Sequence, residues 1–211
     1  MNNDIILVGG GGHCKSAIEL IRSFGLFNIA GIVDIKENIG KEILGIPVIG
    51  TDDDIFSIRK EYSKFVVTIG QIKSHLVRER IFNTLKEAGA ELPVITAKSA
   101  FVSETARVGE GTMIFHQAVV NAEAAVGVNC IINNLSLVEH DCVIGDHCHL
   151  STGALLNGNV HVGKGSFIGS NACIIQGIEI GEMSVIGAGS LVVKNVMSGA
   201  TVTGVPAVKF S

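Results

Sequence analysis

The chain has 211 residues, a length that allows one large domain or two small ones. It is 47% hydrophobic and 5% aromatic, lacks tryptophan, and carries a net charge of −4. This acidic balance argues against a nucleic-acid-binding protein, which usually shows a basic stripe. No signal peptide is recognisable, and no apolar run approaches the length of a membrane span. We therefore expect a soluble, cytoplasmic protein that binds neither nucleic acid nor membrane.

The first part of the chain alternates apolar runs with amphipathic segments. Strands are expected at Ile5–Val8, Ile29–Val33 and Phe65–Ile69, and helices at Cys14–Phe24, Asp52–Tyr62 (with Thr51 as N-cap) and Ser74–Ala88. This alternation is typical of a small parallel α/β sheet. Residues 1–92 are therefore expected to form a Rossmann-like domain, joined by the hinge Leu92–Phe101 to a second domain over residues 93–211.

The second part repeats with a strict period of six, which neither a helix nor an ordinary strand explains. Sixteen consecutive hexads carry an aliphatic residue at the same position: Val102, Val108, Ile114, Val120, Val126, Ile132, Val138, Ile144, Leu150, Leu156, Val162, Ile168, Ile174, Ile180, Ile186 and Val192. This period is typical of a hexapeptide parallel β-helix, in which three hexads form one triangular coil. The fifth hexad position holds small residues, among them Cys130, Cys142 and Cys148. We expect these cysteines to fill the core rather than to bind metal or form disulfides.

One hexad places a histidine between two carboxylates. In Val138–Val143 (VEHDCV), the first and fifth residues face the core and His140 stands outward at a corner. An imidazole beside a carboxylate can act as a general base, because the carboxylate fixes its tautomer and raises its basicity. Gly158 lies one coil above, where its missing side chain is expected to leave room for a ligand, and His149 is expected outward on a neighbouring edge. The alternative is a solvated corner histidine without a catalytic role.

A metal site is a further alternative, because His140, His147 and His149 lie close in sequence and some hexapeptide prisms hold zinc with three histidines from two subunits. His147 and His149 occupy the fourth and sixth hexad positions, so they should not converge on one ion within a chain. We therefore expect no metal.

The run Gly9–Gly12 follows the first expected strand and precedes the first helix. The dinucleotide fingerprint G-x-G-x-x-G would need a glycine where Cys14 stands, so NAD is not expected. Such a turn still offers free N–H groups to a phosphate, and His13 could add a donor. Asp34, at the end of the second strand, is placed to meet a nucleoside. The alternative is a tight turn without a ligand.

Four segments now occur together in order: Gly9–His13 (GGGGH), Thr68–Gly70 (TIG), Asn133–Gly145 (NNLSLVEHDCVIG) and Val202–Ala207 (VTGVPA). In these the chain resembles the bacterial sugar acetyltransferases that join a small nucleotide-binding domain to a left-handed β-helix. That family includes N-acetyltransferases of UDP-linked 4-amino-4,6-dideoxy sugars of the bacillosamine type and sialic acid O-acetyltransferases. The resemblance covers nearly the whole chain, and the VEHDCVIG segment is its specific part.

The resemblance implies a left-handed helix, a homotrimer with active sites between neighbouring prisms, and acetyl-CoA as donor. It implies N-acetylation of a nucleotide-linked 4-amino-4,6-dideoxy sugar for glycan biosynthesis. His140 is implied as the general base, Asp141 as its partner, and Asn133 as a neighbour of the acceptor amine. The residues implied for acetyl-CoA are His149, Gly158, Ser170 and Ala188. The residues implied for the nucleotide sugar are Gly11, Gly12, His13, Asp34 and Gly70.

Two departures leave the nucleotide base open between UDP and GDP. UDP-using members often carry a second acidic residue after the one matching Asp34, where this chain has Ile35, and the segment Gln71–Arg78 is longer than in those members. O-acetylation of a sialic acid remains an alternative activity. A metal-dependent prism such as a carbonic anhydrase and a non-catalytic sugar-nucleotide-binding protein are alternatives from other classes. Outward hydrophobic residues are expected at a subunit interface: Phe115, Phe167 and Leu191.

Overall fold

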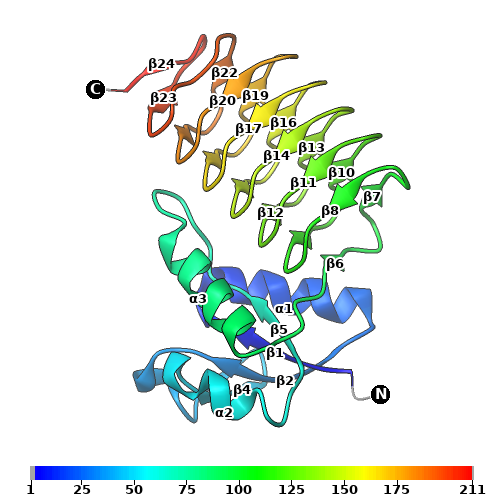
Figure 1. Cartoon of the computed structure of the whole chain (residues 1–211), viewed down its shortest axis with the longest axis vertical. Coiled ribbons are helices and arrows are strands. Elements are labelled where there is room, and N and C mark those ends of the chain that lie inside the picture. The colour runs from blue at the N-terminus through cyan, green and yellow to red at the C-terminus, as the bar shows by residue number, and fades with distance from the viewer. Residues whose placement is uncertain (1–2, 211) are drawn as a thin grey trace.

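The computed structural model describes residues 3–210 and consists of an α/β domain beneath a stack of triangular coils (Figure 1). The α/β domain contains a five-stranded sheet in the order β3-β4-β2-β1-β5. Its strands are β1 (Asp4–Val8), β2 (Asn28–Val33), β3 (Glu42–Ile43), β4 (Ile46–Gly50) and β5 (Lys64–Val67). Its helices are α1 (Gly12–Phe24), α2 (Ile55–Ile58) and α3 (Leu76–Glu87), with 3-10 turns at η1 (Lys36–Asn38) and η2 (Asp52–Asp54). All neighbouring strands are parallel except β3, which runs antiparallel to β4.

Two features of this domain differ from the sequence prediction. The hairpin of β3 and β4 was not expected, because Pro47 interrupts the segment and only Val48 and Gly50 of β4 are buried. The helix expected over Asp52–Tyr62 is only the 3-10 turn followed by the single turn of α2. Thr51 nevertheless begins it as expected, with a capping box to Asp54.

The period of six gives a three-sided parallel β-helix, as the sequence predicts. Face 1 comprises β7 (Phe101–Val102), β10 (Val119–Val120), β13 (Leu137–Val138), β16 (Leu155–Leu156), β19 (Cys173–Ile174) and β22 (Leu191–Val192). Face 2 comprises β8 (Arg107–Val108), β11 (Ala125–Val126), β14 (Val143–Ile144), β17 (His161–Val162) and β20 (Glu179–Ile180). Face 3 comprises β6 (Ile95–Thr96), β9 (Met113–Ile114), β12 (Ile131–Ile132), β15 (His149–Leu150), β18 (Phe167–Ile168), β21 (Val185–Ile186), β23 (Thr201–Thr203) and β24 (Val208–Lys209).

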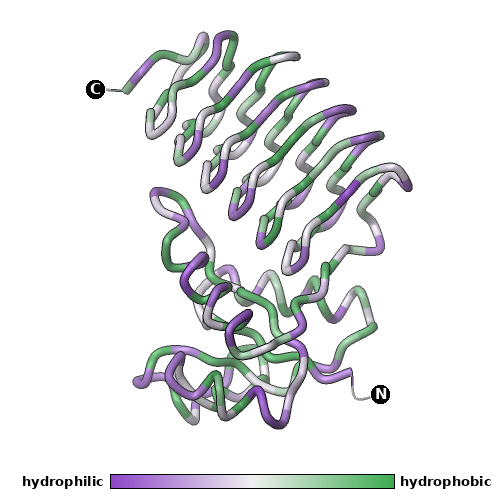
Figure 2. Tube along the Cα trace, viewed as in Figure 1, coloured by the Kyte–Doolittle hydropathy of each residue, from purple (hydrophilic) through white to green (hydrophobic). Residues whose placement is uncertain are grey.

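The interior of the prism is a single apolar column filled by the first and fifth residues of the hexads. Hydrophobic segments recur in every coil of the trace in Figure 2. Cys130, Cys142 and Cys148 are fully buried free thiols, and each donates from Sγ to a carbonyl oxygen of the following coil at 3.2 Å. Burial raises the pKa of the Cys130 thiol to about 12, so these cysteines are inert core residues.

The α/β domain is docked on face 3. Met113 and Ile131 point outward from the prism, but both are fully buried because they share a hydrophobic cluster with Ile18 and Ile21 of α1. Phe115 belongs to the same cluster and is only 1% exposed. The expectation that Phe115 lies at a subunit interface is therefore wrong, since the protein's own N-terminal domain covers it. No helix within residues 3–210 combines the length and apolarity needed to cross a membrane.

Candidate active site

Three edges of the prism carry the turns between its faces, and each has a different environment. The His140 edge lies between faces 1 and 2 and includes residues 139–141 and 157–159. The Asn133 edge lies between faces 3 and 1 and includes residues 133–135, 169–171 and 187–189. The docking edge lies between faces 2 and 3 and includes residues 127–129, 145–147 and 163–165. The His140 edge is the one opposite face 3, so it lies away from the docked α/β domain.

His140 and Asp141 form the hydrogen-bonded pair that the sequence predicts. His140 Nδ1 lies 2.8 Å from Asp141 Oδ2, and because a carboxylate only accepts, Nδ1 must be the donor. This fixes the tautomer and leaves a lone pair on Nε2. Both side chains are exposed, at 61% and 58%. The hydrogen bond that His140 donates to Asp141 raises the pKa of His140 above its ordinary value, with a smaller contribution from the charge of Glu139.

The backbone of this corner is held in place by its neighbours. Asp141 has a left-handed φ of 61°, and this conformation turns the chain at the same position in successive hexads. Glu139 Oε2 accepts from Asn121 Nδ2 at 2.8 Å and from the backbone N–H of His140 at 3.2 Å. The imidazole therefore projects from a rigid turn rather than from a mobile loop.

Gly158 makes room for the imidazole of His140, and it also lines the hollow beside the ring, where the sequence analysis expects a ligand. A Cβ at this position would lie 2.6 Å from both Cε1 and Nε2 of His140. The ring therefore lies directly against the next coil, and a side chain at position 158 would displace it. The surrounding hollow has a volume of about 670 Å³ and is lined by Glu139, His140, Asn157, Gly158, Asn159, Gln176 and Gly177.

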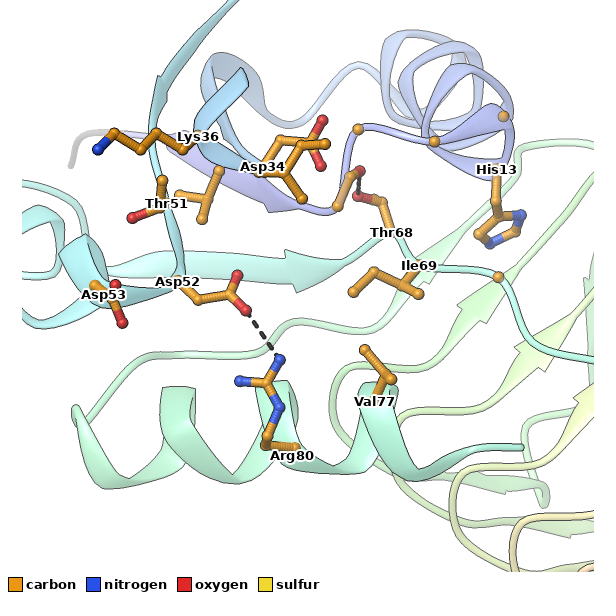
Figure 3. A pocket seen from close by; sticks show the side chains of 17 residues that line it. His13, Asp34, Lys36, Thr51, Asp52, Asp53, Thr68, Ile69, Val77 and Arg80 are labelled. Carbon is orange, nitrogen blue, oxygen red and sulfur yellow. Dashed lines mark hydrogen bonds and ion pairs between the residues drawn. The ribbon is translucent and has the colours of Figure 1, made fainter. Parts of the chain in front are cut away.

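A second, larger cavity of about 800 Å³ lies at the carboxyl ends of the strands of the α/β sheet (Figure 3). It brings together all five residues expected to bind the nucleotide sugar: Gly11, Gly12, His13, Asp34 and Gly70. Helix α1 begins here with 13 residues, no side-chain cap and no acidic residue in its first turn. Its free N–H groups and positive end therefore face the cavity, as a phosphate-binding site requires.

The glycines of this cavity fall into two kinds. Gly9 has a φ of +110°, and a Cβ on Gly10 would lie 2.3 Å from Asp34 Oδ2, so the fold itself requires these two. Side chains on Gly11 and Gly12 would meet nothing within 4 Å. Their lack of a side chain serves no packing need within the chain, and it leaves the backbone open to a ligand.

His149, which is buried, and His13, which is partly buried, lie side by side between the two domains. Their ring centroids lie 6.1 Å apart, and Phe115 packs against His13. Burial lowers the pKa of His13 to about 3 and that of His149 to about 4, so both are neutral at physiological pH. His13 can therefore offer a phosphate at most a neutral donor. His149 points outward from the prism, as expected, but it lies on face 3 and not on an edge. It is 7% exposed and donates from Nδ1 to the carbonyl of Gln71, because the α/β domain covers it.

Other lining residues of the large cavity were not anticipated. The carboxylates of Asp52 and Asp53 follow the end of β4, and Asp52 forms an ion pair of 3.0 Å with Arg80 of α3 (Figure 3). Lys36 lines the same end. Recognising Ile46–Gly50 as a parallel strand would have pointed to Asp52, because the carboxyl ends of parallel strands meet at one edge.

The structure does not bring all the expected residues together within one chain. Asn133, Ser170 and Ala188 share the Asn133 edge, separated by face 1 from His140. Asn133 Oδ1 accepts from the next backbone N–H at 2.8 Å, and Ser170 Oγ lies 2.9 Å from Ser151 Oγ. Within residues 3–210 no group of three His, Cys, Asp or Glu side chains is arranged to hold a metal ion.

Comparison with known proteins gives matches to both parts of the chain. The PglD N-terminal domain family matches residues 4–85, and the family of the hexapeptide repeat of succinyl-transferase matches residues 159–194. A search of curated protein sequences gave no significant match.

Several solved structures are similar over the full length. A histidine-to-asparagine mutant of perosamine N-acetyltransferase from Caulobacter crescentus, in complex with CoA and GDP-perosamine, has 33% identity and a TM-score of 0.93, covering 99% of this chain and 97% of that chain. The acetyltransferase domain of PglB from Neisseria gonorrhoeae FA1090, in complex with acetyl coenzyme A, has 32% identity and a TM-score of 0.92, covering 100% of both chains. WeeI from Acinetobacter baumannii AYE has 27% identity and a TM-score of 0.87, covering 98% of this chain and 100% of that chain.

The fold and these matches define an acyltransferase of the hexapeptide-repeat class. Within that class, the chain belongs to the bacterial sugar N-acetyltransferases that join a PglD-type N-terminal domain to a left-handed β-helix.

Proposed function

We propose that the protein transfers the acetyl group of acetyl-CoA to the 4-amino group of a nucleotide-linked 4-amino-4,6-dideoxy sugar. The observation that carries this proposal is the His140–Asp141 pair packed on Gly158, in a chain similar over its full length to N-acetyltransferases crystallised with CoA or acetyl-CoA. The large cavity of the α/β domain would hold the nucleotide, with its diphosphate at the start of α1. A cytoplasmic location fits a reaction that consumes acetyl-CoA and a nucleotide sugar.

His140 is the proposed general base. The ammonium of the sugar first loses one proton to solvent, because only the free amine has a lone pair. The nitrogen then attacks the thioester carbon while His140 Nε2 takes the second proton. The C–S bond breaks, and the protonated imidazole returns that proton to the departing thiolate of CoA. Asp141 stabilises the imidazolium formed between these steps.

The active site is proposed to form between subunits of a homotrimer. The outward residues of face 1 are apolar in every coil: Phe101, Val119, Leu137, Leu155, Cys173 and Leu191. Outward positions of face 2 instead include Arg107, His161 and Glu179. If face 1 packs around a three-fold axis, the His140 edge of one subunit meets the Asn133 edge of the next. His140 would then approach the acetyl-CoA residues Ser170 and Ala188 and the nucleotide cavity of a neighbour.

GDP is the favoured nucleotide. Three of the similar structures are complexes with GDP-perosamine. Ile35, which lines the cavity, replaces the acidic residue frequent in UDP-using relatives. Guanine is also the larger base, and it presents adjacent N–H donors that the carboxylates of Asp52 and Asp53 could accept.

The test is thiol release from acetyl-CoA with GDP- and UDP-linked 4-amino sugars and with sialic acids as acceptors. His140→Ala should lower kcat about 10²- to 10⁴-fold and leave acetyl-CoA binding nearly unchanged. His161→Ala is the matched control, because His161 is an exposed histidine on face 2. Release only with a sialic acid would overturn the choice of acceptor. An unchanged kcat in His140→Ala would overturn the choice of base.

A mixing experiment tests the shared site. Subunits carrying His140→Ala and subunits carrying Gly12→Asp, which blocks the nucleotide cavity, should each be inactive alone. After unfolding and refolding together, mixed trimers should regain activity, because some interfaces pair an intact base with an intact cavity. No recovery in mixed trimers would mean that both halves of the site come from one chain.

A further inference from the structure

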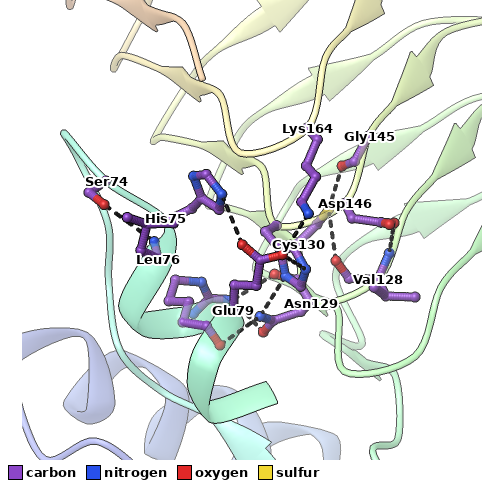
Figure 4. Close-up of polar contacts among 12 residues, drawn as sticks. Ser74, His75, Leu76, Glu79, Val128, Asn129, Cys130, Gly145, Asp146 and Lys164 are labelled. Carbon is purple, nitrogen blue, oxygen red and sulfur yellow. Dashed lines mark hydrogen bonds and ion pairs between the residues drawn. The ribbon is translucent and has the colours of Figure 1, made fainter. Parts of the chain in front are cut away.

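The segment that ends in the first turns of α3, residues 71–79, docks the α/β domain on the prism. Gln71 Nε2 donates to the carbonyl of Gly165 at 3.2 Å, and Glu79 accepts from Lys164 Nζ at 2.5 Å. Figure 4 shows Glu79 of α3 joined to Lys164 of the docking edge across this junction. The polar contacts of the segment are therefore directed at the docking edge.

Arg78 is the most deeply buried of these contacts, with 1% of its surface exposed. Its guanidinium donates to the carbonyls of Val67 and Ile69, at the end of β5, and to the carbonyl and Oδ1 of Asn129 at 2.7 and 2.8 Å. Asn129 Nδ2 returns a hydrogen bond to the carbonyl of Arg78. One side chain thus joins two acceptors of the α/β domain to two acceptors of the docking edge.

Within residues 3–210 this cation has no carboxylate partner, because the ion pairs formed there involve other basic groups. Burial lowers the pKa of Arg78 to about 10, which still leaves it protonated at neutral pH. Burying a charge without an ionic partner costs free energy, so a contribution to stability does not by itself explain an arginine at this position. A guanidinium has five donors in one rigid plane, so it can bind the four acceptors of this junction at the same time.

A continuous chain of contacts leads from Arg78 to the nucleotide cavity. Ile69 follows β5 and lines the cavity. Its side chain packs on the start of the glycine-rich turn, where a Cβ on Gly9 would lie 2.3 Å from Ile69 Cγ1. Moving the Ile69 carbonyl would therefore disturb the turn whose N–H groups face the cavity.

We propose that Arg78 is a positioning residue for the nucleotide sugar: through Ile69 it holds the Gly9–Gly12 turn in its binding shape and fixes the cavity relative to the prism. This inference rests on the proposed role of the cavity as the nucleotide site. Arg78 touches neither substrate nor the reacting atoms.

The experiment uses Arg78→Met, Arg78→Lys and Asn129→Gly in the full chain. Asn129 has a left-handed φ of 53°, so glycine is tolerated there while the Oδ1 acceptor is removed. Arg59→Met is the matched control, because Arg59 is a partly exposed arginine of the same domain that donates to the carbonyl of Gly89. Calorimetry measures GDP and CoA binding, and hydrogen exchange follows the amides of Gly9–His13.

Arg78→Met should weaken GDP binding by about tenfold, the loss expected from one or two hydrogen bonds, and change CoA binding less than twofold. Exchange at Gly9–His13 should become faster, Arg78→Lys should recover only part of the affinity, and Asn129→Gly should follow Arg78→Met. Equal weakening of GDP and CoA, or faster exchange spread evenly over the chain, would reduce Arg78 to a stabilising residue and overturn the proposal. If Arg78→Met does not fold, the same measurements of GDP binding, CoA binding and hydrogen exchange on Asn129→Gly test the proposed role of Arg78.

The two proposals fail separately. A wild-type protein that binds CoA but acetylates no amino sugar would contradict the proposed function. The exchange difference between the Arg78 variants and Arg59→Met would still decide the role of Arg78.

Discussion

Replacing Gly158 with alanine should displace the imidazole of His140, the proposed general base, without touching either substrate. The added Cβ would lie 2.6 Å from His140 Nε2, whereas ordinary contact begins near 3.4 Å, so the ring must retreat by roughly 0.8 Å. Such a shift breaks the 2.8 Å hydrogen bond to Asp141 or moves Nε2 away from the amine. Misplacement on the order of 1 Å can cost about 10²-fold in rate. We therefore expect kcat to fall by about 10²-fold.

The assay is steady-state thiol release, with both KM values measured. Gly158 does not have a left-handed φ, so alanine should not strain the backbone, and the melting temperature should stay close to that of the wild type. The double variant with His140→Ala provides the control. If Gly158→Ala acts through the imidazole, it should add nothing once the imidazole is gone.

Two results would refute this reasoning. An unchanged kcat would show that the ring adapts without loss. A full further loss in the His140→Ala background would show that position 158 acts on acetyl-CoA rather than on the base.

Three further predictions follow from the same geometry. Asp141→Asn removes the main cause that raises the pKa of His140. The acid limb of the pH profile of kcat/KM, where the base becomes protonated, should therefore move to lower pH, and the plateau value should fall. An acid limb that stays in place would contradict the pairing of His140 with Asp141. Leu155→Asp places a charge on face 1, so the protein should sediment as a monomer and show no thiol release. A monomer that remains active would exclude a site shared between subunits. Gly12→Ala should weaken GDP binding at unchanged melting temperature, while Gly10→Ala should lower the melting temperature by several degrees, because only the second Cβ meets neighbouring atoms.

The prism could be predicted almost completely from the sequence, because each coil repeats one local rule. The aliphatic residue at every sixth position faces the interior of the prism, and this does not depend on contacts with distant parts of the chain. Residues eighteen positions apart lie directly above one another in neighbouring coils. This is why His140 and Gly158 could be placed together without a structure. The contact between the His140 ring and Gly158 could not be predicted from the sequence, because it depends on the rotamer of the imidazole.

The junction between the domains could not be predicted, because it is set by contacts distant in sequence. The outward direction of His149 follows from the hexad, but its burial depends on Gln71, 78 residues away. Phe115 was misassigned for the same reason. The acidic end of the large cavity was missed with β4, because Pro47 interrupts this strand and only two of its residues are buried.

The stacking of equivalent turns restricts how such a chain can change its length during evolution. An insertion of eighteen residues adds one coil, lengthens the prism by about 4.8 Å, and returns every later side chain to its original edge. An insertion of six residues between the docked domain and His140 would keep the core pattern intact yet carry the His140–Asp141 pair to a different edge. Gaps in alignments of related prisms should therefore come in whole coils on the N-terminal side of this pair, and tolerance of other lengths should be confined to loops that project from the turns.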